Sequence, residues 1–420
     1  MSLGVVLIVA LMPVHAFLST WLGTSIGPLL VWKSWKELLL VALLPAVLWY
    51  MVLRPDIGRT LWSRWVNRLI LAYSVLQIGL SFVSTASAQA VIAGLMMNLR
   101  FLAIFVLVQV IVEARPTYLA RLGQWAPRWL LLVMLGLGVL ALLQVYALPV
   151  DFLTHFGYNK DATIAPYVLV DQNPHALRAF ATLRGPNTLG SYLLLPLAAA
   201  ASLLYARRRD WLAWASLSFG VVALVLSGSR SAWLGFGVML VTLMLVLLPR
   251  AHIARSVKVW AVPVLVLAAA IGWAATTLPA VRLAVFHSSP GDNSLNEGSD
   301  AKHWEAAAQG IADVVRHPWG SGPGSAGPAS FYNTGPPNLS ENYYVQVAQE
   351  AGLIGLGLFA AILLCTALRI VRRMADPLAI ALLASFAGMA VVNIFLHGWA
   401  DDPTALTWWA LAGLYIGRAR

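Results

Sequence analysis

The feature that most limits the fold of this chain is a series of apolar runs of about 17–22 residues each. A helix of that length crosses the hydrocarbon core of a bilayer, because roughly 20 residues cover about 30 Å. Only 11% of the residues are charged. We therefore predict an all-α, polytopic integral membrane protein with a single membrane domain, residues 1–420. About twelve spans are expected, at residues 3–22, 37–53, 66–83, 90–112, 129–150, 188–206, 211–228, 232–248, 259–278, 345–364, 378–396 and 404–417.

Positive charges are distributed unevenly between the connections of these spans. The formal net charge of +11 would suggest nucleic-acid binding in a soluble protein. Here, however, 18 of the 28 Lys and Arg residues fall in alternate connections and the C-terminal tail. Because Lys and Arg collect on the cytoplasmic side, these segments and both termini are predicted to be cytoplasmic, and no nucleic-acid partner is expected. The segments are residues 54–68, 113–128, 207–210, 250–258, 369–376 and 418–420.

Two long connections are then predicted on the outer face, and they hold most of the polar residues of chemical interest. The first, residues 151–187, ends in the stretch TLRGPN, so that Arg184 stands just before the sixth span. The second, residues 279–344, is inserted between the ninth and tenth spans. Within it, residues 299–316 carry apolar side chains at helical spacing, which predicts an amphipathic helix on the outer surface or packed over the spans.

Three stretches, taken in order, are similar to one family. They are RAFATLRGPNTLGSYLLLPL, LSGSRSAWLGF, and HPWGSGPGSAG followed by SENYYVQVAQEAGLIGLGLF. Together, over about residues 180–360, they resemble the superfamily of O-antigen ligases and bacterial polysaccharide polymerases. The resemblance implies an enzyme of the bacterial inner membrane that moves a glycan from undecaprenyl diphosphate to an acceptor hydroxyl on the periplasmic side, without nucleotide sugar, cofactor or metal. Ligases use lipid A core as the acceptor, and polymerases use another carrier-linked repeat.

A reaction of this kind needs fixed cations, because the diphosphate leaving group gains negative charge as the sugar–phosphate bond breaks. Arginine suits this task, since its planar guanidinium binds phosphate oxygens in pairs and stays charged. Arg184 and Arg230 are predicted at the outer ends of spans and are the first candidates, although Arg230 could instead reach lipid headgroups. Arg316 is a further candidate, and Asn342 and Tyr343 are predicted to contact the diphosphate or the glycan.

The reaction also needs a base for the acceptor hydroxyl. Ligases of the superfamily commonly carry a histidine directly before the asparagine that opens the helix after the long loop. This chain has Glu341 before Asn342, and the change favours a polymerase over a ligase. Glu341 is the first candidate base, with a helix cap as the alternative role, and His317 is the second, with helix termination as the alternative. Attack from the face opposite the diphosphate would invert the anomeric carbon.

Other charged residues stand in less informative positions. Arg100 falls near the middle of the fourth span and must face the protein interior or a watery cavity, so hydrogen bonding to Asn98 and a substrate role both remain open. The acidic turn with His397, Asp401 and Asp402 is predicted to cap the last span rather than to orient an acceptor sugar.

A secondary transporter or a flippase for lipid-linked sugars is the rival from another class. Such proteins also have about twelve spans, but they tend to carry repeated halves, and no repeat is evident in this sequence. A flippase would need charged residues deep within many spans, and only Arg100 clearly fits this requirement. Metal is not expected, because Cys365 is the single cysteine and no group of His or carboxylate residues has metal-ligand spacing.

Overall fold

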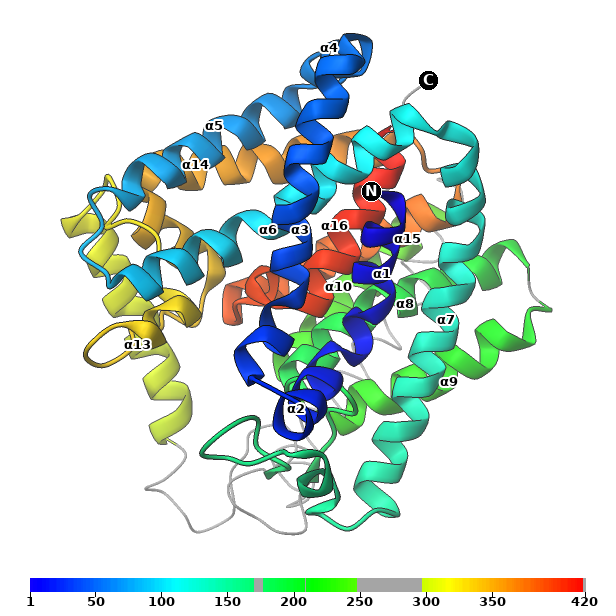
Figure 1. The fold of residues 1–420 in the computed structure, drawn as a ribbon. Coiled ribbons are helices and arrows are strands. Elements are labelled where there is room, and N and C mark those ends of the chain that lie inside the picture. The colour runs from blue at the N-terminus through cyan, green and yellow to red at the C-terminus, as the bar shows by residue number, and fades with distance from the viewer. Residues whose placement is uncertain (170–176, 208, 248–296, 418–420) are drawn as a thin grey trace.

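The computed structural model describes residues 1–169, 177–207, 209–247 and 297–417, which are almost entirely helical (Figure 1). Eight helical segments in these residues are long and apolar enough to cross a membrane, which confirms an all-α polytopic protein. The helices are α1 (Ser2–Leu11), α2 (His15–Ser25), α3 (Leu29–Leu53), α4 (Pro55–Trp62), α5 (Trp65–Ser81), α6 (Ala88–Ala114), α7 (Pro116–Tyr146), α8 (Pro186–Ala206), α9 (Trp211–Leu226), α10 (Arg230–Leu247), α13 (Glu297–Arg316), α14 (Tyr343–Val371), α15 (Pro377–Phe395) and α16 (Asp402–Gly417).

Eleven of the twelve predicted spans coincide with these helices. The first span comprises α1, a short 3-10 helix and α2 in succession, and each of the others corresponds to one helix. The ninth predicted span, 259–278, and the first part of the loop 279–344 lie outside the described residues. A two-stranded antiparallel hairpin, β1 (Val168–Leu169) and β2 (Leu177–Arg178), interrupts the first long connection.

Close helix packing at small residues builds the core. α16 lies along α6, and a Cβ atom at Gly413 would stand 2.6 Å from the carbonyl oxygen of Phe105. α10 packs on α15 in the same way, since a Cβ atom at Gly235 would stand 2.8 Å from the carbonyl oxygen of Gly388. In a bilayer such contacts matter because lipid tails are as apolar as the side chains, so that tight van der Waals packing drives association. α8 is enclosed by α7, α9, α10 and α15.

α14 is interrupted at Gly352, whose φ of 69° and ψ of −175° are not helical. The segment that follows α13, residues 318–327, lies against this break and is called the glycine segment below. The Leu353 amide donates to the Pro318 carbonyl (2.9 Å), and the Gly322 amide donates to the Glu350 carbonyl (2.9 Å). The glycine segment therefore supplies hydrogen bonds to backbone groups that the interrupted helix leaves unpaired, as backbone buried within a membrane protein requires.

The carboxylate of Glu350 fixes the glycine segment from the α14 side. It is fully buried, and its Oε1 accepts a hydrogen bond from the Gly324 amide (2.7 Å) while its Oε2 accepts one from Asn98 Nδ2 (2.8 Å). Gly324 has φ 84°, and a Cβ atom there would stand 2.3 Å from the Ala90 carbonyl oxygen of α6. The position thus requires glycine, and the segment is held between α6 and α14.

The amphipathic helix predicted over 299–316 is present as α13. It packs on α14 through Gly310, and its Asp313 accepts a hydrogen bond from Gln349 Nε2 (3.2 Å). Trp304 and Val315, two of the apolar side chains at helical spacing in this segment, are exposed. The helix therefore packs over the first half of α14 with one face and leaves part of its apolar side uncovered.

The connections gather at two ends of the bundle. The arginine-rich connections meet at one end, upper right in Figure 1, and we call this end the arginine-rich face. Thr60, Glu113, Arg207 and Arg372 line one cavity there. The hairpin, α2 and α13 lie toward the lower left, at the end that we call the loop face. This grouping matches the alternation that the charge distribution predicts.

Candidate functional site

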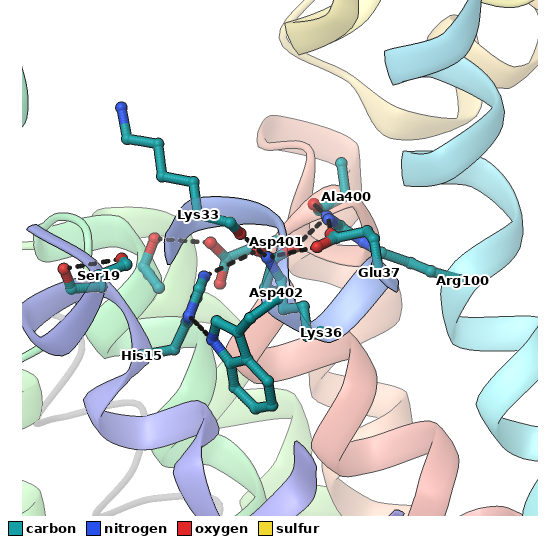
Figure 2. Close-up of polar contacts among 12 residues, drawn as sticks. His15, Ser19, Lys33, Lys36, Glu37, Arg100, Ala400, Asp401 and Asp402 are labelled. Atoms are coloured by element: carbon teal, nitrogen blue, oxygen red, sulfur yellow. Dashed lines mark hydrogen bonds and ion pairs between the residues drawn. The ribbon is translucent and has the colours of Figure 1, made fainter. Parts of the chain in front are cut away.

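Four charged side chains from α3, α6 and α16 meet inside the bundle near the loop face (Figure 2). Arg100 Nη1 pairs with Glu37 Oε1 (2.8 Å), and Arg100 Nη2 pairs with Asp402 Oδ1. Lys36 Nζ pairs with Asp402 Oδ2 (2.9 Å) and with Glu37 Oε2 (3.0 Å). His15 of α2 stands 3.7 Å from the same Asp402 carboxylate. We call these five residues the ion-pair network.

The ion-pair network balances its own charge, because two cations face two carboxylates. Burying a charge in a membrane protein is costly unless it is paired, and each partner here is paired. The structure thus places Arg100 in the protein interior, where it forms ion pairs. Asn98, the hydrogen-bond partner considered for Arg100, donates to Glu350 instead. Asp402, predicted to cap the last helix, is the first residue of α16, and cations of α3 and α6 pair with its carboxylate.

A second group of charges surrounds the first turn of α8. Pro186 occupies the first helical turn, where its fixed φ suits a helix start and its missing amide costs nothing. Arg178 Nε donates to the Ser227 carbonyl (2.8 Å), and Arg178 Nη2 donates to Asn187 Oδ1 (2.9 Å). The hairpin and the turn between α9 and α10 are thereby fixed against α8, which brings Arg178 close to Arg230, the first residue of α10.

The other side of the same helix turn carries Arg184 and a carboxylate. Asp401 accepts hydrogen bonds from Thr188 Oγ1 (3.1 Å) and Thr404 Oγ1 (3.2 Å). Arg184 is exposed, and it lies within electrostatic range of both Asp401 and Lys33. Asp401, predicted to cap a helix, stands directly before α16, and its side chain joins α8 to α16 beside Arg184, one of the predicted phosphate ligands.

Lys33, Arg178, Arg184 and Arg230 form what we call the cationic cluster. Burial is the main cause that lowers the pKa of Arg178 to about 10, and the nearby charge of Arg230 adds to it, so Arg178 remains charged at neutral pH. Burial raises the pKa of Asp401 to about 6, Asp402 raises it further, and Arg184 opposes both. The N-termini of α8 and α10 add partial positive charge to the cluster, so the site is suited to an anion.

The residues predicted at the start of α14 form a separate group. The Asn342 side chain caps this helix by accepting from the amides of Tyr344 (2.9 Å) and Val345 (3.0 Å). Tyr343 is fully buried, and its ring packs edge-on against Phe359 with centroids 5.6 Å apart. Glu341, just before the cap, is half-buried and has φ 51°, which is unusual for a residue other than glycine.

Arg316 and His317 lie at the end of α13, and both side chains are exposed. Arg316 Nη1 stands 3.7 Å from Asp313 Oδ1 of its own helix. α13 lies at the left of the molecule in Figure 1, whereas α8 and α10 lie toward its centre. The structure therefore brings Arg184 and Arg230 to one helix turn, and it places Arg316 and His317 beside a different part of the bundle.

Sequence reasoning gave no role to Lys33 or Glu350 and little weight to Arg178. Lys33 stands just before a predicted span, at the end of that span expected on the outer face. This position was the one sign in the sequence that Lys33 could contribute a positive charge there. Arg178 lies in the same long connection as Arg184, but only the folded hairpin shows that it faces α8. Glu350 is a carboxylate within a predicted span, and such a residue calls for a buried partner.

Fold and site together define a polytopic membrane protein with a cation-lined site at one end of its helix bundle. Residues 215–360 match the family model described as O-antigen ligase. This match supports the resemblance of the sequence to the superfamily of O-antigen ligases and polysaccharide polymerases. The long apolar helices are those of a multi-pass membrane protein. A comparison with curated proteins found no match.

The matched region contains Arg230 and Glu341 but neither Arg184 nor Asp401. The cationic cluster thus combines Arg230 of the matched region with Lys33 of α3 and with Arg178 and Arg184, which precede α8. For this reason a comparison limited to residues 215–360 captures only part of the site.

Proposed function

We propose that this protein is a polysaccharide polymerase that moves a glycan from undecaprenyl diphosphate to a hydroxyl of another carrier-linked repeat, at the periplasmic face of the membrane. The observation that carries the proposal is the cationic cluster at the loop face, opposite the arginine-rich connections. Transfer to lipid A core by a ligase is the second candidate. Glu341, which stands where ligases commonly have histidine, favours the polymerase.

The cationic cluster supports the binding of a lipid diphosphate. Arg184 and Arg230 flank the first turn of α8 and offer planar guanidinium groups for the phosphate oxygens. Both helix N-termini at this point favour negative charge as well. As the bond between the anomeric carbon and the phosphate oxygen breaks, the electron pair stays on that oxygen, and the same cations stabilise the additional charge.

Two carboxylates are candidates for the base that takes the proton of the acceptor hydroxyl. Asp401 stands beside Arg184, and a pKa raised to about 6 suits a base that works near neutral pH. Glu341 has a strained backbone at the N-terminus of α14, and strained residues are frequent at functional sites. His317, exposed at the end of α13, remains a third candidate. The deprotonated oxygen attacks opposite the diphosphate, so the anomeric configuration inverts.

The first experiment measures glycan chains and carrier lipids in cells that express R184Q, R230Q or R54Q protein at equal levels. Arg54 is the matched control, because it is exposed on the arginine-rich side and pairs with Asp56. We expect R184Q and R230Q each to lower chain synthesis by about 100-fold, a usual cost of removing one group that stabilises a developing oxyanion. Normal glycan in both variants would overturn the proposed diphosphate site.

The accumulated lipid distinguishes the two candidate functions. Cells without the protein should accumulate single repeat units on undecaprenyl diphosphate if it is a polymerase. Long polymer on the carrier, together with unsubstituted lipid A core, would instead identify a ligase.

The base is identified by comparing E341Q, D401N and H317Q, which change the proton acceptor while they keep its size. The variant with the lowest rate and an unchanged affinity for the donor marks the base. We also propose that the reaction needs no metal, so a chelator such as EDTA should leave the rate of the purified enzyme unchanged.

A further inference from the structure

The arginine-rich face contains a cavity of about 1330 Å³, larger than most small-molecule pockets. It lies between the ends of α6, α8 and α16 and the starts of α7 and α15. Five guanidinium groups line it, and they come from three connections of the chain and from α7. They belong to Arg64, Arg128, Arg207, Arg372 and Arg373.

The carboxylates of this cavity do not balance its arginines. Glu113, Asp210 and Asp376 also line it, which leaves an excess of two positive charges. Glu113 already pairs with Arg64, while Asp210 and Asp376 accept backbone amides as the caps of α9 (3.2 Å) and α15 (3.0 Å). Arg369 lies within electrostatic range of Arg64 and adds to the positive potential. An anion in the cavity would relieve this repulsion.

Exposed aromatic residues indicate the depth of the cavity in the membrane. Trp125 of α7, Tyr205 of α8 and Trp211 of α9 are all exposed, and they stand near the helix ends that surround the cavity. Trp and Tyr collect at the level of the lipid headgroups, so the cavity lies at that level. Its wall also includes apolar side chains, such as Val112 and Leu203. A ligand that fits must combine a phosphate with an apolar part.

We propose that this cavity binds the headgroup phosphate of an anionic phospholipid from the leaflet at the arginine-rich face. Guanidinium groups bind phosphate oxygens in pairs, and basic pockets between membrane helices are suited to anionic headgroups. Arg128, Arg207 and Arg372 are exposed and reach the headgroup, while the apolar wall receives the start of the acyl chains. The site is remote from the cationic cluster, and the proposal stands independently of the transferase function.

The test uses the full-length protein purified in detergent, with lipid binding counted by native mass spectrometry. Phosphatidylglycerol is the probe, phosphatidylcholine is the neutral comparison, and inorganic phosphate is the soluble competitor. The R207Q/R372Q variant removes two exposed arginines of the cavity. The R121Q/R209Q variant is the matched control, because it removes two exposed arginines from neighbouring positions that do not line the cavity.

We expect the protein to bind phosphatidylglycerol at least ten-fold more tightly than phosphatidylcholine. The R207Q/R372Q variant should bind phosphatidylglycerol at least ten-fold more weakly than the original protein. The control variant should bind like the original protein. Equal loss in both variants would overturn the site, and inorganic phosphate that displaces phosphatidylglycerol completely would show that the ligand is a free phosphate. If R207Q/R372Q does not fold, R207K/R372K keeps the charge and should still weaken binding, because lysine cannot bind phosphate in the same paired manner.

Discussion

The two ends of this molecule both use arginine, but in different ways. On the arginine-rich face the cations are numerous and stand mostly at exposed helix ends. Near the loop face they are few, and those of the ion-pair network are buried and matched by carboxylates. The comparison teaches that the number of positive charges at each end indicates the orientation of a membrane protein. The burial and pairing of charges instead indicate which of them join its helices.

The largest expected effect is an all-or-none difference in chemical labelling. In a C365S background, a cysteine at Thr334 on the loop face should react with a membrane-impermeant maleimide added to intact spheroplasts. A cysteine at Arg209 should react only after the membrane is opened, since both positions are exposed and differ in the face they occupy. The opposite labelling pattern would reverse the proposed orientation and remove the periplasmic site.

The second effect concerns burial and pairing directly. R100M should lower the free energy of unfolding by about 3–5 kcal/mol, because it leaves Glu37 and Asp402 buried with a single shared cation, Lys36. The control is R54M, which breaks an ion pair between exposed Arg54 and Asp56 and should change stability very little. Thermal unfolding of both variants in the same detergent gives the comparison, and equal melting temperatures would contradict it.

A smaller effect is expected when a substitution keeps the positive charge of an arginine but changes the geometry of its hydrogen-bond donors. R178K keeps the positive charge but cannot donate to both Ser227 and Asn187 as Arg178 does. We expect an approximately ten-fold lower rate of glycan transfer, because about 1.4 kcal/mol of positioning energy corresponds to that factor. R121K on the arginine-rich face should leave the rate unchanged, and a similar fall in both variants would argue against a specific role.

The smallest effect is a change of the transfer rate with pH. Because burial raises the pKa of Asp401 to about 6, this carboxylate is ionised above pH 6 and protonated below it. If Asp401 is the base, the rate should rise between pH 5 and pH 7 with a midpoint at about 6, and the small residual activity of D401N should lack this step. The contribution of Asp401 to the stability of the folded protein changes with pH in the opposite direction to the rate. Its raised pKa favours the folded protein at low pH, and this stabilisation is lost as the pH rises through 6.

The sequence predicted the spans well because each span is a local pattern of about twenty apolar residues. It could not predict the ion-pair network, since Glu37, Arg100 and Asp402 belong to three spans that are distant in the chain and meet only in the bundle. The break in α14 was missed for a similar reason. Gly352 looks like any glycine in an apolar helix, and only its contact with the glycine segment shows that the helix stops there.

The candidate site was predicted in part. Arg184 and Arg230 were expected at the ends of spans, and the structure places both around the start of α8. The assignment of roles to Asn342 and Tyr343 rested on their place in a motif, whereas the structure shows a helix cap and a buried ring. For Asp401 the sequence favoured a helix cap over contact with an acceptor sugar, and it gave no sign of Thr188 and Arg184, which only the fold brings beside this carboxylate.

The glycine segment also limits which positions in this part of the chain can accept a new side chain. Its backbone lies at contact distance from α6 and α14, so a side chain introduced at Gly324 would displace the helices before it could meet a substrate. Trp319, Phe331 and Tyr332 stand within or just after the same segment, but their side chains are exposed and free to vary in size. A mutant library in this region would therefore vary these three aromatic positions and leave the glycines unchanged.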